Sequence, residues 1–219
     1  MKKILFFAVL FSFFACNQSQ TEATTQAKTV ELEPRKQAKN VILMIGDGMG
    51  LTQITAGLYS NNNRLHLERL PYIGLHKSYS SDDLVTDSAA GATAFSAGVK
   101  TYNGAIGVDS EQQSVGTILE EAEQVGLATG LIATSTIVHA TPASFIAHVP
   151  DRNMYEAIAA DFLSTDVDLF IGGGAKFFNR REKDERNLFE ELAAKGYVVS
   201  SYMDKALDKT KVDFNKNFA

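Results

Sequence analysis

The chain has 219 residues, 45% of them hydrophobic, and a formal net charge of −5 at pH 7. This length is sufficient for one sizeable domain core. The mildly acidic balance and the lack of a basic cluster argue against a nucleic-acid-binding surface. The only cysteine is Cys16, so an oxidising compartment would add no disulfide within the chain.

The first 15 residues predict a secretory signal, because a short basic start precedes an apolar run over residues 4–15. That run is shorter than the roughly 20 residues that span a bilayer. The tetrad from Phe13 to Cys16 resembles a bacterial lipoprotein processing site, with Phe13 in the usual place of Leu. We therefore expect an exported protein of the periplasm or cell envelope, attached to a membrane by lipid on Cys16. Simple cleavage and a soluble exported protein is the alternative.

Residues 16–38 are rich in Gln, Thr, Ala, Lys and Glu and lack an apolar period. Such a composition buries too little surface to fold, so this segment is predicted to be a flexible tether behind the lipidated cysteine. The folded domain is then expected over residues 39–219.

The domain opens with an apolar run at residues 41–45, which predicts a buried strand that ends in the turn Gly46-Asp47-Gly48-Met49-Gly50. Helical periodicity follows from Leu51. The glycine spacing does not match the dinucleotide fingerprint, and the charge of Asp47 would oppose a pyrophosphate. At the carboxyl end of a buried strand, Asp47 is placed to bind a hard cation. A tight turn with a helix-capping aspartate is the alternative.

A second segment places Ser88 directly behind Asp87, at the start of a run of small helix formers. A helix N-terminus offers free backbone N–H groups and a partial positive charge. Ser88 could therefore lose its proton more easily and face an anion. Taken alone, the same pair is also typical of an ordinary helix cap.

A third segment runs from His139 to Arg152 and follows a predicted strand at residues 127–134. Thr141 precedes Pro142, which favours Thr141 as N-cap and Pro142 as first helical residue. The planar guanidinium of Arg152 could bind a phosphate through two hydrogen bonds. Each residue also has a structural alternative: a turn residue, a cap and a solvated charge.

Strands and helices alternate along the rest of the chain. This alternation predicts an α/β fold, a doubly wound and largely parallel sheet with helices on both faces and ligands at the carboxyl ends of the strands. Gly172-Gly173-Gly174 is predicted to be a tight turn, because no Lys-Ser/Thr follows in the register of a phosphate loop. The expected elements are a helix at 114–125 ended by Gly126, a helix carrying Met154, Ile158 and Phe162, a strand at 169–171, a helix carrying Leu188, Phe189 and Leu192 and ended by Gly196, and a strand at 197–199.

Four segments, KNVILMIGDGMG, VTDSAAGATAFSAGVKTYNGAIGVD, HATPASFIAHVPDRN and DLFIGGGAKFF, resemble the alkaline phosphatase family in this order, over roughly residues 39–178. The resemblance implies an alkaline-phosphatase-like fold, two zinc ions, one magnesium ion and hydrolysis of phosphate monoesters through a phosphoserine. Members are often dimers, so a homodimer is a further expectation.

The resemblance also assigns roles to individual residues. Ser88 would be the nucleophile, Arg152 would hold two phosphate oxygens, and Asp87 would orient Arg152. Asp47 would bridge the magnesium site and one zinc site, and Thr141 would complete part of the magnesium site. His139 stands where some members have Asp and others His. Because imidazole suits zinc better than magnesium, His139 is an open candidate ligand and the identity of the third metal stays open.

The family's remaining zinc ligands lie in its C-terminal half, and nothing after Arg152 offers a comparable set of donors. We therefore expect the C-terminal part of the domain to be missing, the 219 residues alone to be inactive, and the parent protein to be the enzyme. A related phosphodiesterase or sulfatase-type metallohydrolase, and a catalytically incompetent fragment or non-catalytic lipoprotein, are the alternatives.

Overall fold

The computed structural model describes residues 38–210, 213 and 215–219. The predicted signal, Cys16 and the tether as far as residue 37 lie outside these described residues. The chain divides into two units, residues 1–44 and residues 45–219. Within the described part, no helix is both long and apolar enough to cross a membrane.

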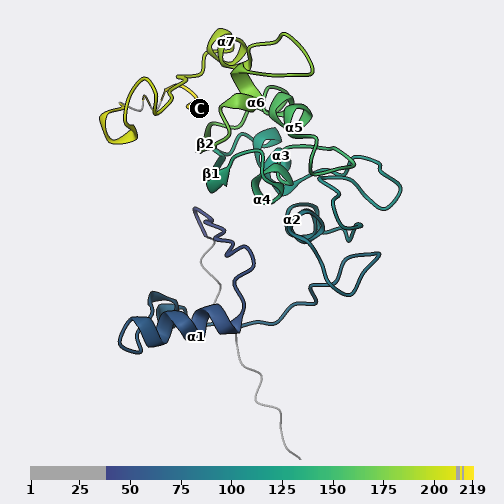
Figure 1. Cartoon of the computed structure of the whole chain (residues 1–219), viewed down its shortest axis with the longest axis vertical. Helices are drawn as coiled ribbons and strands as arrows, with labels where there is room; N and C mark the ends of the chain where they lie inside the picture. The colour runs from purple at the N-terminus through teal and green to yellow at the C-terminus, as the bar shows by residue number, and fades with distance from the viewer. Residues whose placement is uncertain (1–37, 211–212, 214) are drawn as a thin grey trace, which may run out of the picture. The chain divides into compact units, whose positions relative to one another are not determined.

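The second unit contains a parallel pair of strands with short helices beside them (Figure 1). The strands pair in register at Gly130 with Leu169 and at Ile132 with Ile171. Helices between the paired strands make the crossover that a parallel arrangement requires, so the α/β class predicted from the sequence is confirmed. In chain order the elements are α1 (Leu51–Ser60), η1 (His66–Arg69), α2 (Ser88–Ala97), α3 (Ile118–Gln124), β1 (Gly130–Thr136), α4 (Ala140–Ala143), α5 (Tyr155–Asp161), β2 (Leu169–Gly173), α6 (Lys176–Asn179), α7 (Leu188–Ala194) and η2 (Leu207–Lys209).

The core lies between β2 and the helices α5 to α7. Phe170 of β2 packs against Phe162, with ring centroids 4.6 Å apart, and stacks on Phe178 at 6.1 Å. Leu188 and Leu192 of α7 are fully buried beside this aromatic group. Burying a side chain of this size contributes about 1.5–3 kcal/mol, so each of these residues stabilises the packing of β2 against the helices.

The helix boundaries follow local capping chemistry. Thr117 caps α3: its Oγ1 accepts from the Glu120 amide at 3.2 Å, and Glu120 Oε2 accepts from the Thr117 amide at 2.9 Å. This capping box starts the helix later than the predicted residue 114. Gly126 (φ +73°) and Gly196 (φ +99°) follow α3 and α7 in the left-handed region, as predicted for helix ends.

The predicted buried strand at residues 41–45 is wrong. Residues 38–44 contain no strand, and the side chains of Val41 and Ile42 are each 86% exposed. A strand exists only where a neighbouring backbone completes its ladder, and the two described strands pair with each other. Only Ile45, in the second unit, packs against the core.

The predicted strand at 197–199 is reduced to one bridge. Val198 pairs in parallel with Phe218, and Phe218 also pairs with Leu169 at the start of β2. The Phe218 backbone therefore occupies the edge of β2 that a strand at 197–199 would otherwise use. Among the described residues, the sheet consists of two strands with these bridges at its edge.

One polar cluster ties three parts of the second unit together. The ring of His148 contacts the carbonyl of Gly107 through Nδ1 (2.7 Å) and the carboxylate of Glu120 through Nε2 (2.8 Å), while its backbone N–H donates to Asp161 (3.1 Å). Both ring partners are oxygen acceptors, so the protonated ring can donate to both of them at once. Burial by itself lowers the pKa of His148, but hydrogen bonds to Glu120 and Gly107 outweigh burial and raise it.

We predict that this charged ring makes folding stability depend on pH. Because the pKa of His148 is raised in the fold, its contribution is complete below the unfolded value of about 6.5 and is lost as the pH rises through the folded value. His148→Gln should lower the free energy of unfolding at pH 6 by about 1–3 kcal/mol, and the deficit should shrink by pH 9. Urea unfolding at both pH values measures this, with His66→Gln, in an exposed 3-10 helix, as control. A deficit that grows with pH would contradict the prediction.

Candidate functional site

The carboxylate of Asp87 is the junction of the candidate site. Its Oδ1 accepts from the Ala90 backbone N–H at 2.9 Å and thereby caps α2. Its Oδ2 accepts from Nη1 of Arg152 at 2.9 Å and from the Gly104 N–H at 3.0 Å. The half-buried carboxylate thus accepts hydrogen bonds from the start of a helix, from a guanidinium and from a turn. Hydrogen bonds to a charged group are stronger than those between neutral groups.

Ser88 is the first residue of α2, directly behind this junction, as predicted from the sequence. The helix-cap interpretation of this pair is compatible with a role in the site, because Asp87 caps α2 and also forms an ion pair with Arg152. Ser88 is partly exposed, whereas the next two residues, Ala89 and Ala90, are buried. The serine therefore stands where the helix emerges from the core.

The small residues of α2 allow this helix to pack closely against α4. Thr93 Oγ1 lies 3.3 Å from Ser144 Oγ, and Ser96 donates to the Ser144 carbonyl at 2.5 Å. Ala89 and Ala92 are buried in the same region. Larger side chains at these positions would separate the helices, so the alanine-rich pattern serves to bring α4 close to Ser88.

Helix α4 presents two predicted site residues to Asp47. Thr141 Oγ1 donates to Asp47 Oδ2 at 3.0 Å, and Nδ1 of His139 lies 3.8 Å from the same oxygen. Asp47 lies in the turn before α1 and does not cap it, because the N-cap of α1 is Gly50. The helix-capping alternative for Asp47 is therefore excluded by the structure.

The prediction that Thr141 is an N-cap is wrong. The N-cap of α4 is His139, whose carbonyl accepts from the Ala143 N–H at 3.0 Å, and Pro142 is the third helical residue. Proline is tolerated there because the first N–H groups of a helix have no partner within the helix. The earlier start turns the hydroxyl of Thr141 toward Asp47 instead of the helix backbone.

Arg152 connects the two halves of the site. Its Nη1 binds Asp87, and its Nη2 lies 3.3 Å from Nε2 of His139. Guanidinium nitrogens only donate, so in this contact Nε2 of His139 is the acceptor, and Nδ1 faces Asp47. The structure thus brings together Asp87, Arg152, His139, Asp47 and Thr141 in one series of contacts, with Ser88 next to Asp87.

The donor set at Asp47 fits part of a metal site. A carboxylate and a hydroxyl suit magnesium or calcium, and imidazole suits zinc. Over residues 38–210, 213 and 215–219, no three His, Cys, Asp or Glu side chains are close enough to form a metal-binding group. Asp47, Thr141 and His139 could therefore contribute ligands, and a complete site needs further donors.

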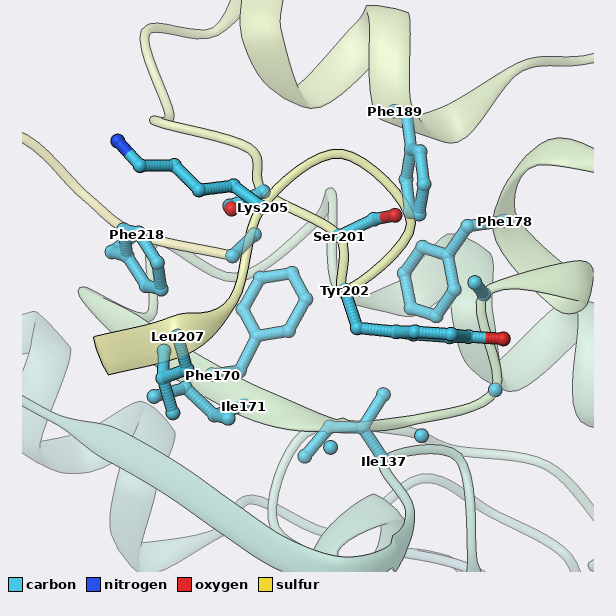
Figure 2. A pocket seen from close by; sticks show the side chains of 16 residues that line it. Ile137, Phe170, Ile171, Phe178, Phe189, Ser201, Tyr202, Lys205, Leu207 and Phe218 are labelled. Atoms are coloured by element: carbon cyan, nitrogen blue, oxygen red, sulfur yellow. The ribbon is translucent and has the colours of Figure 1, made fainter. Parts of the chain in front are cut away.

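The glycine triplet at the end of β2 lines a separate cavity of about 240 Å³. Figure 2 shows that Phe170, Phe178 and Tyr202 line this cavity. Apolar residues dominate the lining, which does not suit a doubly charged phosphate ester. The prediction that Gly172-Gly173-Gly174 forms a tight turn is wrong for its first two residues, because Gly172 and Gly173 end β2 and Gly173 pairs with Thr136. Gly174 follows the strand with φ +101°. None of the predicted site residues borders this cavity.

Comparison with known proteins identifies the family. The sequence model of the alkaline phosphatases matches residues 38–214, so the chain belongs to the alkaline phosphatase family. It is 40% identical to alkaline phosphatase 3 of Bacillus subtilis (strain 168) over 225 residues, which cover 96% of this chain and 47% of that protein. It is 39% identical to alkaline phosphatase of Escherichia coli (strain K12), with 76% of this chain and 42% of that protein covered.

Solved structures agree with this assignment. The structure superimposes on alkaline phosphatase from the Antarctic bacterium TAB5 with a TM-score of 0.71 and 39% identity, over 78% of this chain and 50% of that one. A histidine-to-aspartate variant of the TAB5 enzyme is described with Mg bound in its M3 site. The chain spans about half the length of the curated relatives it matches.

Sequence reasoning missed two residues of the site, Asn103 and Gly104. Both contact Asp87: the Asn103 side chain accepts from the Asp87 N–H at 2.7 Å, and the Gly104 N–H donates to its carboxylate. An Asn-Gly pair is a turn signal, and Gly104 adopts φ +95°. That signal predicts a turn, but not which segment the turn contacts.

We predict that the Asp87 junction stabilises the fold through two separable contributions. Asp87→Asn keeps a good N-cap but loses the ion pair with Arg152, which should lower the free energy of unfolding by about 1.5–3 kcal/mol. Asp87→Ala should lose about a further 1 kcal/mol with the cap. Urea unfolding of both variants measures the difference, with Asp208→Asn in the exposed η2 as control. Equal free energies of unfolding for Asp87→Asn and the wild type would show that the ion pair does not stabilise the fold.

Proposed function

We propose that the full-length protein hydrolyses phosphate monoesters, with Ser88 as the nucleophile. The observation that carries the proposal is the ion pair between Asp87 and Arg152 at the N-terminus of α2, which places a guanidinium beside the residue preceding Ser88. Membership of the alkaline phosphatase family supports it. Because the chain covers about half of its relatives, the proposal concerns the full-length protein.

The residues of the chain have distinct tasks in this reaction. The N-terminus of α2 favours loss of the Ser88 proton and attracts the phosphate anion. Arg152 has five N–H donors, of which Asp87 and His139 use two, so others are available for phosphate oxygens. Asp87 fixes the guanidinium so that it need not reorganise when charge develops.

The reaction has two balanced steps. Ser88 Oγ forms a bond to phosphorus, the bond between phosphorus and the ester oxygen breaks, and the alcohol leaves with a proton. Water then attacks phospho-Ser88, which releases inorganic phosphate and restores the hydroxyl. In both steps Arg152 would balance negative charge on the phosphoryl oxygens.

We further propose that Asp47, Thr141 and His139 supply part of the ligands for two zinc ions and one magnesium ion. When bound, such ions neutralise phosphate charge and lower the pKa of a coordinated hydroxyl or water. The Mg-bound variant of the TAB5 enzyme supports a magnesium site in this family. Because His139 is an imidazole, the third position could also hold zinc.

The proposal includes the setting in which the protein works. The signal-like residues 1–15 and the lipoprotein-like tetrad ending at Cys16 support export to the periplasm or cell envelope with a lipid anchor. Residues 39–219 would then follow the tether as part of the phosphatase domain. The frequent occurrence of dimers in the family supports a homodimer.

Substitution of the nucleophile tests the activity. In the full-length protein supplied with zinc and magnesium, Ser88→Ala should lower the kcat for p-nitrophenyl phosphate by at least about 10³-fold, because no other group forms the covalent bond. Ser110→Ala, in an exposed loop, should leave it unchanged.

Substrate choice separates the related chemistries. We expect the monoester to be hydrolysed faster than bis-p-nitrophenyl phosphate and p-nitrophenyl sulfate. Faster hydrolysis of the diester or the sulfate would favour a phosphodiesterase or sulfatase. Wild-type protein that hydrolyses none of the three would favour a non-catalytic lipoprotein.

A further inference from the structure

The turn at residues 102–105 contacts both segments that carry the candidate site. It is closed by a hydrogen bond from the Ala105 N–H to the Tyr102 carbonyl at 3.2 Å. One neighbouring segment, residues 82–87, leads into Ser88. The other, residues 149–152, ends at Arg152. The turn is therefore placed to set the distance between the serine and the arginine.

The side chain of Asn103 holds the first segment. Its Nδ2 donates to the Val85 carbonyl at 2.9 Å, and its Oδ1 accepts from the Asp87 N–H at 2.7 Å. The amide thus uses a donor and an acceptor on alternate residues of one extended segment, as a neighbouring strand would. In addition, the Asn103 N–H donates to Asp82 Oδ1 at 3.0 Å.

The core does not hold this segment in place. The side chains of Leu84 and Val85 are 89% and 75% exposed, so apolar packing adds little order just before Ser88. Asp82, at the start of this segment, has a lowered pKa because the Ser80 hydroxyl and then the Asn103 N–H donate to it. Hydrogen bonds to residue 103 therefore replace packing as the restraint on this approach to α2.

Different atoms of the turn hold the arginine segment. The Arg152 N–H donates to the Gly104 carbonyl at 2.8 Å, and the Tyr102 hydroxyl donates to the Pro150 carbonyl at 2.9 Å. Paired hydrogen bonds between Ile106 and Val149 continue this contact. The side chain of Asn103 takes part in none of these contacts, so its loss would affect the serine side selectively.

We propose that Asn103 is a positioning residue that fixes the backbone of residues 85–87 and thereby aligns the Ser88 hydroxyl with Arg152. This inference rests on the proposed function, because it assigns a task within the same site. Asn103 touches neither substrate nor metal in this account. It acts through the backbone N–H of Asp87, one residue before the nucleophile.

Kinetics of the full-length protein test whether Asn103 affects the position of Ser88 but not phosphate binding by Arg152. Asn103→Ala should lower the kcat for p-nitrophenyl phosphate by about 10–100-fold, because small misplacements of a reacting group have effects of this size. The inhibition constant of inorganic phosphate should change less than about threefold, because Arg152 keeps its own contacts. A general loss of structure would change both values together.

Amide hydrogen exchange provides a readout that does not depend on activity. In Asn103→Ala the Asp87 N–H should lose protection, whereas the N–H groups of Ala90 and Arg152, which bond to Asp87 Oδ1 and Gly104, should keep theirs. The isosteric Asn103→Asp keeps the acceptor for the Asp87 N–H but not the donor to Val85. It should retain Asp87 protection and lose less kcat than Asn103→Ala. This variant also provides the test if the alanine variant does not fold.

Asn187→Ala is the matched control. Asn187 caps α7, and its Oδ1 also accepts a backbone N–H, from Phe189 at 3.2 Å, without contact to the site. It should leave kcat, phosphate inhibition and Asp87 protection unchanged. Unchanged kcat in Asn103→Ala, or equal losses of kcat and phosphate affinity, would overturn the inference. Wild-type protein without phosphatase activity would instead overturn the proposed function.

Discussion

The carboxylate of Asp87 accepts hydrogen bonds from three parts of the chain that are 3, 17 and 65 residues away in sequence. Each donor alone is ordinary: a helix N–H, a turn N–H and a guanidinium. Together they fix one negative charge at the start of α2, and the charge is stable there because the helix terminus and Arg152 are both positive. The candidate site depends on this constraint, because it holds Ser88 and the guanidinium of Arg152 next to the same residue.

Close packing of α2 against α4 extends this arrangement toward Asp47. The buried alanines and the hydroxyl contacts to Ser144 bring α4 close, and α4 then presents His139 and Thr141 to Asp47. Arg152 joins the two groups through its contact with His139. In this account, phosphate binding by Arg152 and metal binding at Asp47 depend on connected contacts. A substitution that moves Arg152 should therefore also affect metal binding.

Local signals predicted what depends on local chemistry. The start of α2 at Ser88 and the glycine ends of α3 and α7 follow from capping preferences within a few residues. Residues 41–45 were mispredicted because a strand depends on a partner elsewhere in the chain, which a local apolar run does not reveal. The Asn103 contacts were missed for the same reason, since its partners Val85 and Asp87 lie 18 and 16 residues away. Family likeness, by contrast, named Asp47, Ser88, Thr141 and Arg152 without any geometry.

The central claim is that Ser88, held at the Asp87 junction, forms a covalent bond to phosphorus. Rapid acid quenching of the full-length protein during turnover of p-nitrophenyl phosphate, followed by mass spectrometry of its peptides, tests this directly. The account predicts a single phosphoryl group on Ser88 that appears during turnover and is absent from Ser88→Ala. Turnover with the phosphoryl group on a different residue, or with none on the protein at any time, would contradict it.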